Sequence, residues 1–215
     1  MTDTPIGRPG DAREAVLQRI RDALADRPPA APTPRDYDVA LPAGTDRIEL
    51  FVERVGDYRA NVRRTAAVDL PATLATVLAA QGARRVVVPA GIPDAWLAGS
   101  AVERVGDEPP LSHAELDGLD GVVTGCAVAI AETGTIVLDA GPDQGRRALS
   151  LLPDLHVCIV RVDQIVGSVP ESLGRLQPTR AQTWISGPSA TSDIELQRVE
   201  GVHGPRRLEV IVVEE

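Results

Sequence analysis

The feature that most constrains the fold is a change of rhythm near residue 66. From Ala66 onwards, short apolar stretches alternate with segments of helical periodicity, a pattern typical of an α/β sheet. Strands are expected over residues 66–69, 85–89, 121–131, 135–139, 156–162, 182–186 and 208–213. Helices are expected over residues 71–81, 93–97, 113–119, 143–152 and 170–176. Thr133-Gly134 indicates a tight turn, which predicts a β-hairpin from the strands on either side of it.

The N-terminal part of the chain follows a different pattern. Residues 11–25 carry apolar side chains on one stripe and Arg or Asp on the other, as an amphipathic helix does. Residues 27–44 are rich in proline and poor in apolar side chains, which predicts an extended, protease-sensitive arm. A second helix is expected to be capped by Thr45 and to include Val62. We therefore expect N-terminal helices and a proline-rich arm over residues 1–64, and an α/β domain over residues 65–215.

The composition excludes several classes of function. The net charge is −9, and all 22 basic residues are arginines. An acidic chain with five aromatic residues repels a phosphate backbone and offers few stacking surfaces, so nucleic-acid binding is not expected. No stretch of 18 apolar residues and no signal-like N-terminus occurs, so we expect a cytoplasmic protein with no membrane span.

The sequence also limits the metals and cofactors that the chain can hold. Cys126 and Cys158 are its two cysteines, fewer than a four-cysteine iron–sulfur or zinc site requires. Both lie in apolar stretches and are expected to be small core residues. No second histidine lies at metal-ligand spacing from His203. We therefore expect neither a metal nor a cofactor in this chain.

Polar residues gather in three loops at the ends of expected strands: residues 131–135, 186–195 and 201–206. Ligands of open α/β sheets bind where strand ends converge, so we expect the three loops to line one crevice. The expected ligand-binding residues are Thr133, Gly134, Thr135, Ser186, Gly187, Ser189, Thr191, Asp193, Glu195, Gly204 and Arg206. Arg146 and Arg147 follow the hairpin as part of a solvated helix start, from which one arginine could face the crevice.

Two residues of these loops are candidates for catalysis. Glu132 follows an apolar strand and precedes a glycine turn, a position suited to a base, a nucleophile or a hydroxyl acceptor. The alternative is a solvent-exposed hairpin residue. His203 lies between glycines and can act as an acid, a base or a hydrogen-bond donor near neutral pH. A purely structural hydrogen bond is the alternative for His203, and ordinary helix capping is the alternative for the hydroxyls of residues 186–192.

The same loops carry a resemblance to a known family. Thr124-Gly-Cys-Ala-Val-Ala-Ile-Ala-Glu-Thr-Gly-Thr135, then Ser186-Gly-Pro-Ser189 with Asp193-Ile-Glu195, then Gly201-Val-His-Gly-Pro-Arg206 resemble the LUD-domain family, within it the lactate utilization protein C group. The resemblance covers roughly residues 62–213. It implies an open twisted sheet of the NagB/RpiA/CoA-transferase-like type with an N-terminal helical arm. It also implies a role in oxidising L-lactate to pyruvate beside iron–sulfur partner subunits.

Three functional hypotheses follow. In the first, the chain is a non-redox subunit or accessory protein of an L-lactate oxidation system and binds a small anionic ligand, while iron–sulfur clusters belong only to its partner subunits. In the second, it is a stand-alone enzyme of the sugar-phosphate isomerase or acyl-CoA transferase type that uses Glu132. In the third, the loops are only folding elements.

Overall fold

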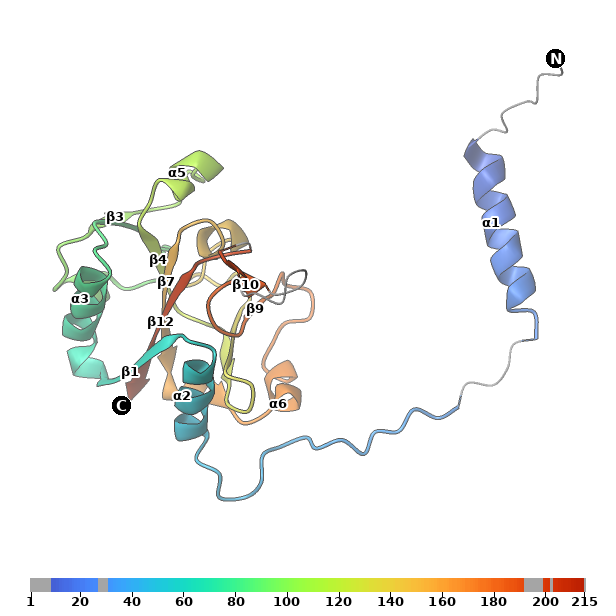
Figure 1. Ribbon diagram of the computed structural model, residues 1–215, viewed down its shortest axis with the longest axis horizontal. Coiled ribbons are helices and arrows are strands. Elements are labelled where there is room, and N and C mark those ends of the chain that lie inside the picture. Colours follow the sequence, from blue (N-terminus) through green and yellow to red (C-terminus); the bar gives the residue numbers. More distant parts are fainter. Residues whose placement is uncertain (1–8, 27–30, 192–198, 202, 215) are drawn as a thin grey trace, which may run out of the picture. The chain divides into compact units, whose positions relative to one another are not determined.

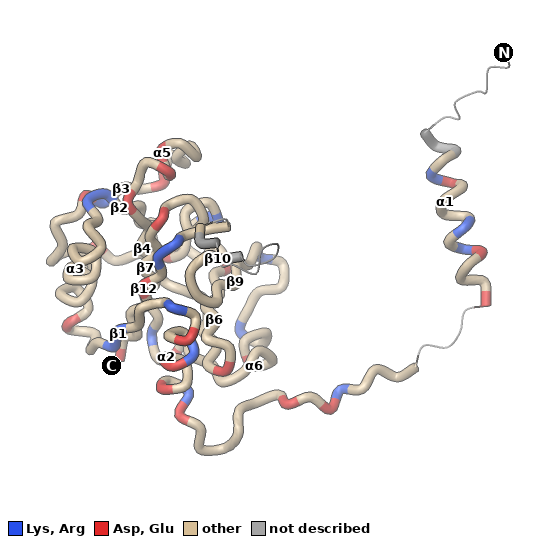
Figure 2. Tube along the Cα trace, in the orientation of Figure 1, with Lys and Arg blue, Asp and Glu red and all other residues tan. Residues whose placement is uncertain are grey.

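The computed structural model of the chain describes residues 9–26, 31–191, 199–201 and 203–214. The chain forms two compact units, Met1–Tyr37 and Asp38–Glu215. The smaller unit contains helix α1 (Pro9–Ala23), along which charges of both signs occur (Figure 2). Val16 and Ile20 of this helix and Leu24, just after its end, are largely exposed. No helix among the residues described is long and apolar enough to cross a membrane.

The larger unit is built on a six-stranded sheet in which every neighbouring pair of strands is parallel. In spatial order its strands are β1 (Asn61–Ala66), β12 (Arg207–Glu214), β7 (Leu155–Arg161), β4 (Gly121–Thr124), β2 (Arg85–Val87) and β3 (Glu103–Val105). β7 and β12 lie inside the sheet and are buried along almost their whole length. Continuous apolar stretches are typical of parallel strands that are covered on both faces.

A second sheet of four strands packs against one face of the first. Its spatial order is β8 (Ile165–Val166), β5 (Val128–Ile130), β6 (Thr135–Leu138) and β9 (Thr183–Ile185). β5 and β6 pair antiparallel, which confirms the predicted hairpin. Two further strands, β10 (Ala190–Thr191) and β11 (Val199–Glu200), pair with each other.

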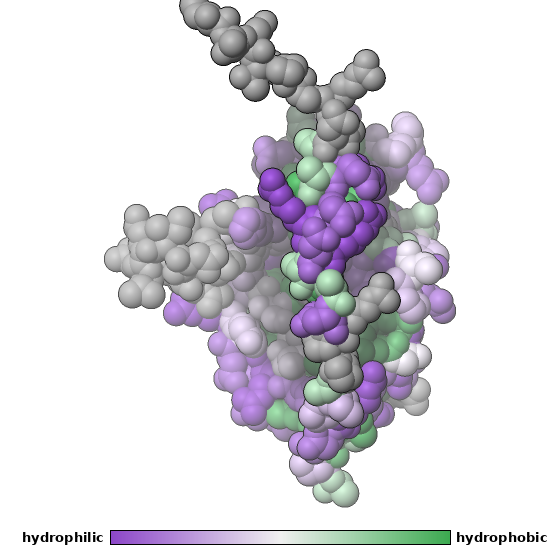
Figure 3. All heavy atoms as spheres, turned by 90° about the vertical axis from the view of Figure 1, so that its right-hand side faces the viewer, coloured by the Kyte–Doolittle hydropathy of each residue, from purple (hydrophilic) through white to green (hydrophobic). Residues whose placement is uncertain are grey.

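The six-stranded sheet has a different cover on each face. Helix α3 (Leu70–Ala80) packs on one face, where its side chains Leu74 and Leu78 are buried in a hydrophobic cluster with the strands. Helix α2 (Arg47–Asp57) and the second sheet pack on the other face, where Phe51 and Val55 are fully buried. Figure 1 shows α3 and α2 on opposite sides of the strands. Hydrophilic side chains cover much of the surface visible in Figure 3, with smaller apolar areas between them.

Short helices complete the described chain. These are α4 (Asp94–Leu97), α5 (His113–Asp117), α6 (Val169–Leu173) and the 3-10 helices η1 (Ala67–Asp69), η2 (Arg147–Ser150) and η3 (Val162–Gln164). A capping box formed by Ser112 and Glu115 begins α5. The predicted α/β class is confirmed, because a parallel sheet is covered by helices and by a second sheet. The closer likeness to the NagB/RpiA/CoA-transferase group stays a prediction.

The predicted cap and end of the second helix were wrong. Thr45 donates its hydroxyl hydrogen bond to the carbonyl of Pro42, and Asp46 instead caps α2 by accepting hydrogen bonds from two helix amides. The helix ends at Asp57, and Val62 lies in the edge strand β1. α2 is buried against the sheet and belongs to the larger compact unit, which begins at Asp38.

Three other expected elements differ from the structure. The strand expected over residues 121–131 is two strands in different sheets, because the chain leaves β4 at Gly125 and crosses to β5. The helix expected over residues 143–152 is reduced to η2, because Gly145 adopts a φ of +67° that interrupts helical geometry. Residues 67–69 form η1 instead of a strand.

Candidate functional site

A cavity of about 280 Å³ lies between the two sheets, at the amino-terminal ends of β7 and β12. His156 and Leu208 line it from the second positions of these two strands. Its other walls are β9 with the loop that follows it, the turn around Gly204, and η2. We call this space the loop cavity. It contains five of the residues that the sequence predicted for the site: Ser186, Gly187, Ser189, His203 and Gly204.

Backbone and hydroxyl hydrogen bonds hold the two predicted loops together. The amide of Ser189 donates to the carbonyl of Pro205 at 2.8 Å, and the amide of Gly201 donates to the carbonyl of Ser189 at 3.0 Å. The amide of His203 donates to the hydroxyl oxygen of Ser189 at 3.0 Å. Ser189 therefore joins residues 186–189 to residues 201–205 through three separate bonds.

The hairpin turn touches the rim of the loop cavity without lining it. The hydroxyl oxygens of Thr135 and Ser186 lie 2.8 Å apart, and those of Thr133 and Thr135 lie 2.7 Å apart. Thr135 is buried, so this chain of hydroxyls connects the turn to the cavity wall from behind. The arrangement fixes the position of Ser186.

Two of the predicted glycines are required by close packing against the end of α2. Gly134 and Gly187 have φ angles of +59° and +81°. A Cβ on Gly134 would lie 2.7 Å from the carbonyl carbon of Arg54, and one on Gly187 would lie 2.5 Å from the Cβ of Tyr58. Both positions combine a left-handed backbone with a contact that leaves no space for a side chain. Their role is to let both turns approach α2.

Glu132 lies apart from the loop cavity. Its carboxylate accepts a hydrogen bond of 2.8 Å from the amide of Val169, at the first turn of α6. Its own amide donates to the carbonyl of Gly167 at 3.0 Å, and the side chain is otherwise exposed. The structure therefore does not bring Glu132 and His203 into one crevice.

The remaining predicted residues have other positions. Arg206 forms an ion pair with Asp154, with Nε 2.6 Å from Oδ1, and lines a neighbouring hollow. Thr191 pairs with Val199 in the short β10–β11 ladder. Asp193 and Glu195 lie outside the described residues.

The most buried polar group of the loop cavity was not predicted from the sequence. His156 is 1% exposed, and its Nε2 lies 2.7 Å from the hydroxyl oxygen of Thr124 on the neighbouring strand β4. In the described part of the protein, its Nδ1 has no hydrogen-bond partner. The signal available in the sequence was a histidine at the start of an otherwise apolar strand.

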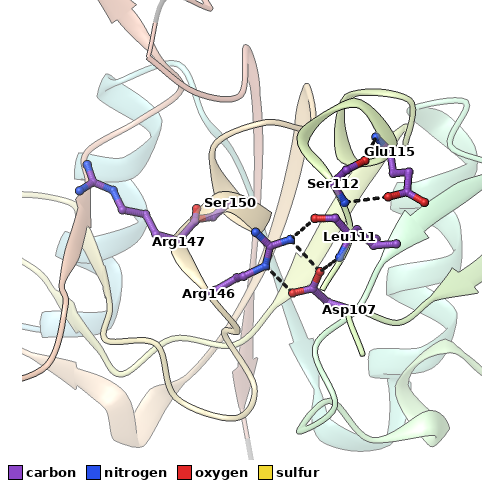
Figure 4. A network of polar contacts seen from close by, with 7 residues as sticks. All are labelled: Asp107, Leu111, Ser112, Glu115, Arg146, Arg147 and Ser150. Carbon is purple, nitrogen blue, oxygen red and sulfur yellow. Dashed lines mark hydrogen bonds and ion pairs between the residues drawn. The ribbon is translucent and has the colours of Figure 1, made fainter. Parts of the chain in front are cut away.

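The adjacent residues Arg146 and Arg147 point in different directions and differ in their contacts (Figure 4). Arg146 holds the carboxylate of Asp107 with two hydrogen bonds, 2.7 and 2.9 Å long, and also donates to the carbonyl of Leu111 at 2.6 Å. Figure 4 shows this clamp and the side chain of Arg147 pointing away from it. Arg147 lines the loop cavity, and its guanidinium forms no ion pair or hydrogen bond with any residue that the structure describes. The arginine that faces the cavity is therefore Arg147.

A wider hollow of about 890 Å³ lies at the carboxyl ends of β2 and β3. Its two arginines are both engaged: Arg104 with Asp94 and with two backbone carbonyls, and Arg146 with Asp107. The Arg146 guanidinium lowers the pKa of the Asp107 carboxyl, because its hydrogen bonds favour the ionised form. No unpaired cation among its described lining residues attracts an anion there, so the loop cavity is the better candidate.

Two buried thiols lie behind His156. The Cys158 thiol is 3.6 Å from the carbonyl oxygen of Gly125, and the Cys126 thiol is 3.6 Å from the side-chain oxygen of Gln164. The hydrogen bond with Cys126 lowers the pKa of Cys158 to about 6; burial opposes this shift and His156 adds to it. The same contact raises the pKa of Cys126. Neither thiol lines the loop cavity, and both are core residues as expected.

The charges of the loop cavity favour an anion. In a protein of net charge −9, its described lining includes one arginine, two imidazoles and several hydroxyls, but no carboxylate. No group of three or more potential metal ligands occurs among the described residues. A small negatively charged molecule is the species that these side chains can hold.

The comparisons place the chain beside a group of bacterial proteins. The LUD domain model matches residues 113–213, a region that contains every residue lining the loop cavity. The chain is 52% identical to lactate utilization protein C of Deinococcus radiodurans, over 98% of this chain and 99% of that protein. It is 28% identical to lactate utilization protein C of Geobacillus kaustophilus, over 94% of this chain and 95% of that protein.

A solved structure supports the same grouping. The crystal structure of a DUF162 family protein from Deinococcus radiodurans matches with a TM-score of 0.66 and 52% identity. The match covers 79% of this chain and 97% of that chain. The chain therefore belongs to the LUD-domain family, within the group of proteins called lactate utilization protein C.

Proposed function

We propose that this protein is a non-redox subunit or accessory protein of a system that oxidises L-lactate to pyruvate. The support is its 52% identity, over nearly the full length of both chains, with a protein named for lactate utilization. Two buried cysteines are fewer than the four ligands that an iron–sulfur cluster usually needs. Electron transfer is therefore assigned to iron–sulfur partner subunits.

In this proposal the loop cavity binds a small anionic ligand. The observation that carries this assignment is that Arg147 pairs with no described residue and lines a cavity whose described lining lacks a carboxylate. The hydroxyls of Ser186 and Ser189 and the imidazole of His203 line the same space and can add directional hydrogen bonds. The alternative of an isomerase or transferase that acts through Glu132 gains no support, because this carboxylate accepts a hydrogen bond from the first turn of α6 and does not line the cavity.

Growth tests the physiological part of the proposal. A clean deletion strain should fail to grow on L-lactate as sole carbon source and should grow normally on glucose. Wild-type protein and Glu132→Gln should restore growth, whereas Arg147→Gln should restore it poorly. Normal growth of the deletion strain on L-lactate would exclude a role in lactate utilization.

Capture at native expression tests the partner assignment. A tagged copy of the full chain should retain proteins with cysteine clusters of iron–sulfur spacing, identified by mass spectrometry. Omission of the chain from a reconstituted mixture of those partners should reduce lactate oxidation. Full lactate oxidation by the partners alone would exclude a subunit role.

A further inference from the structure

The imidazole nitrogen Nδ1 of His156 has no hydrogen-bond partner among the described residues. A buried donor or acceptor without a partner is costly, and such groups in folded proteins usually have an explanation. His156 lines the loop cavity and is 1% exposed, and its Nδ1 has no partner in the described part of the chain. A ligand atom in the cavity would supply the missing hydrogen bond.

Thr124 leaves both hydrogen-bonding roles open to this nitrogen. If the Thr124 hydroxyl donates to Nε2, the ring proton lies on Nδ1, which then donates. If Nε2 donates to Thr124, Nδ1 is an acceptor. A neutral imidazole can therefore bind a ligand carbonyl oxygen or a ligand hydroxyl at the same place.

Arg147 is the second anchor of the cavity. It stands in η2 together with Ser150, three residues further on, and residues at this spacing share one face of a 3-10 helix. Both side chains line the loop cavity. The guanidinium of Arg147 has no partner among the described residues and is suited to a carboxylate, because its parallel N–H groups match the two carboxylate oxygens.

We infer that the loop cavity binds a short carboxylic acid that carries an oxygen on carbon 2. Arg147 binds the carboxylate, and His156 binds the 2-oxygen, whether hydroxyl or carbonyl. The choice of this acid class rests on the proposed function, whereas the two anchors are chosen because both residues line the loop cavity. A volume of about 280 Å³ is at the lower limit of the roughly 300–1,000 Å³ of pockets for larger ligands, so a short acid fits.

Titrations of the purified full-length chain with small acids test the inference. Calorimetry measures the affinity, and NMR of the histidine nitrogens reports the contact with His156. The probes are L-lactate, pyruvate, propionate and inorganic phosphate. Propionate has the carboxylate without the 2-oxygen, so it should bind about tenfold more weakly than L-lactate and pyruvate. L-Lactate should shift the Nδ1 resonance of His156, and propionate should not.

Matched variants separate the two anchors. Arg147→Gln should weaken the binding of L-lactate, pyruvate and propionate by about tenfold or more. Arg63→Gln removes the same charge from the exposed strand β1 and should leave binding unchanged. His156→Gln keeps a polar atom near the Nε2 position and should abolish the preference for L-lactate over propionate. His156→Asn keeps one near the Nδ1 position and should retain more of that preference.

Several results would overturn the inference. These are equal affinities for propionate and L-lactate, unchanged binding by Arg147→Gln, tighter binding of phosphate than of any acid, and no binding of any probe at about 10 mM. The growth test is independent of these titrations. If the deletion strain fails on L-lactate while the purified chain binds no acid, this inference and the ligand-binding part of the proposed function are wrong, whereas the role in lactate utilization stands.

Discussion

The backbone amide of His203 donates a hydrogen bond to the hydroxyl oxygen of Ser189, 3.0 Å away and fourteen residues earlier in the chain. This bond crosses one side of the loop cavity and holds its two loops together. Ser189→Ala should therefore lower the free energy of unfolding by about 1 kcal/mol and weaken L-lactate binding. Ser189→Thr keeps the hydroxyl and should have a smaller effect on both. Chemical denaturation and calorimetry measure the two quantities, and an unchanged Ser189→Ala protein would contradict the structural role.

Gly187 tests the contact between the cavity loop and α2. Gly187→Ala places a Cβ in a left-handed residue and 2.5 Å from the Cβ of Tyr58, so it should lower the free energy of unfolding by about 3 kcal/mol. Gly44→Ala is the matched control, since Gly44 has a φ of +86° and open space around the Cβ position. It should cost only the backbone term of about 1 kcal/mol. Equal unfolding curves for both variants would show that the contact with Tyr58 does not contribute.

The Asp107–Arg146 clamp predicts a dependence of stability on pH. The pKa of Asp107 is lowered in the folded protein, so the clamp contributes its full stability above the unfolded carboxyl value of 3.8. This contribution is lost as the pH falls through the lower folded pKa. Asp107→Asn should reduce the free energy of unfolding by about 1–3 kcal/mol at neutral pH, and the difference from wild type should shrink below about pH 4.

Arg146→Lys is the control for the geometry of this clamp. A lysine keeps the charge but cannot donate two parallel hydrogen bonds, so it should recover only part of the stability. Denaturation at several pH values measures the effect. A difference between wild type and Asp107→Asn that stays constant down to pH values near the folded pKa would contradict the assignment.

Glu132 should matter for folding and not for ligand binding. Glu132→Ala removes the acceptor for the amide of Val169 and should lower the free energy of unfolding by about 1 kcal/mol. Glu132→Gln keeps a side-chain oxygen that can accept the same bond and should be closer to wild type. L-Lactate binding should be unchanged in both. Loss of lactate-dependent growth in a stably folded Glu132→Gln protein would return this carboxylate to the list of catalytic candidates.

The proline-rich arm should be cut before the larger unit is attacked. Residues 31–38 form no helix or strand and are exposed, whereas the carbonyl of Val39 accepts a hydrogen bond of 2.7 Å from Ser168. Trypsin should therefore cleave after Arg35 and leave a fragment that begins at Asp36, which mass spectrometry can identify. Arg35→Gln should remove this cleavage. Protection of this bond in a dilute monomer would show that another segment covers it, and protection that appears only on oligomerisation would identify an assembly element.

The α/β class, the hairpin, and the two loops at Ser186 and His203 that share a cavity could be predicted from the amino-acid sequence. These features depend on local patterns: apolar alternation, a glycine turn, and clusters of small polar residues. Prediction from local patterns was wrong where the same apolar pattern fits both a helix and a strand. Val62 fits the apolar face of a helix, yet it lies in strand β1, which is stabilised by parallel pairing with β12.

Which polar side chains lie close together depends on long-range packing of the chain. Glu132 and Ser186 belong to loops of similar composition, but β6 and β9 run antiparallel, so Thr135 contacts Ser186 while Glu132 reaches α6. Arg146 and Arg147 are neighbours in the chain, and the turn at Gly145 followed by η2 directs them to different partners. His156 gains its role from burial between sheets and from Thr124, thirty-two residues away in the sequence. Contacts of this kind depend on strand order and packing, which no local pattern encodes.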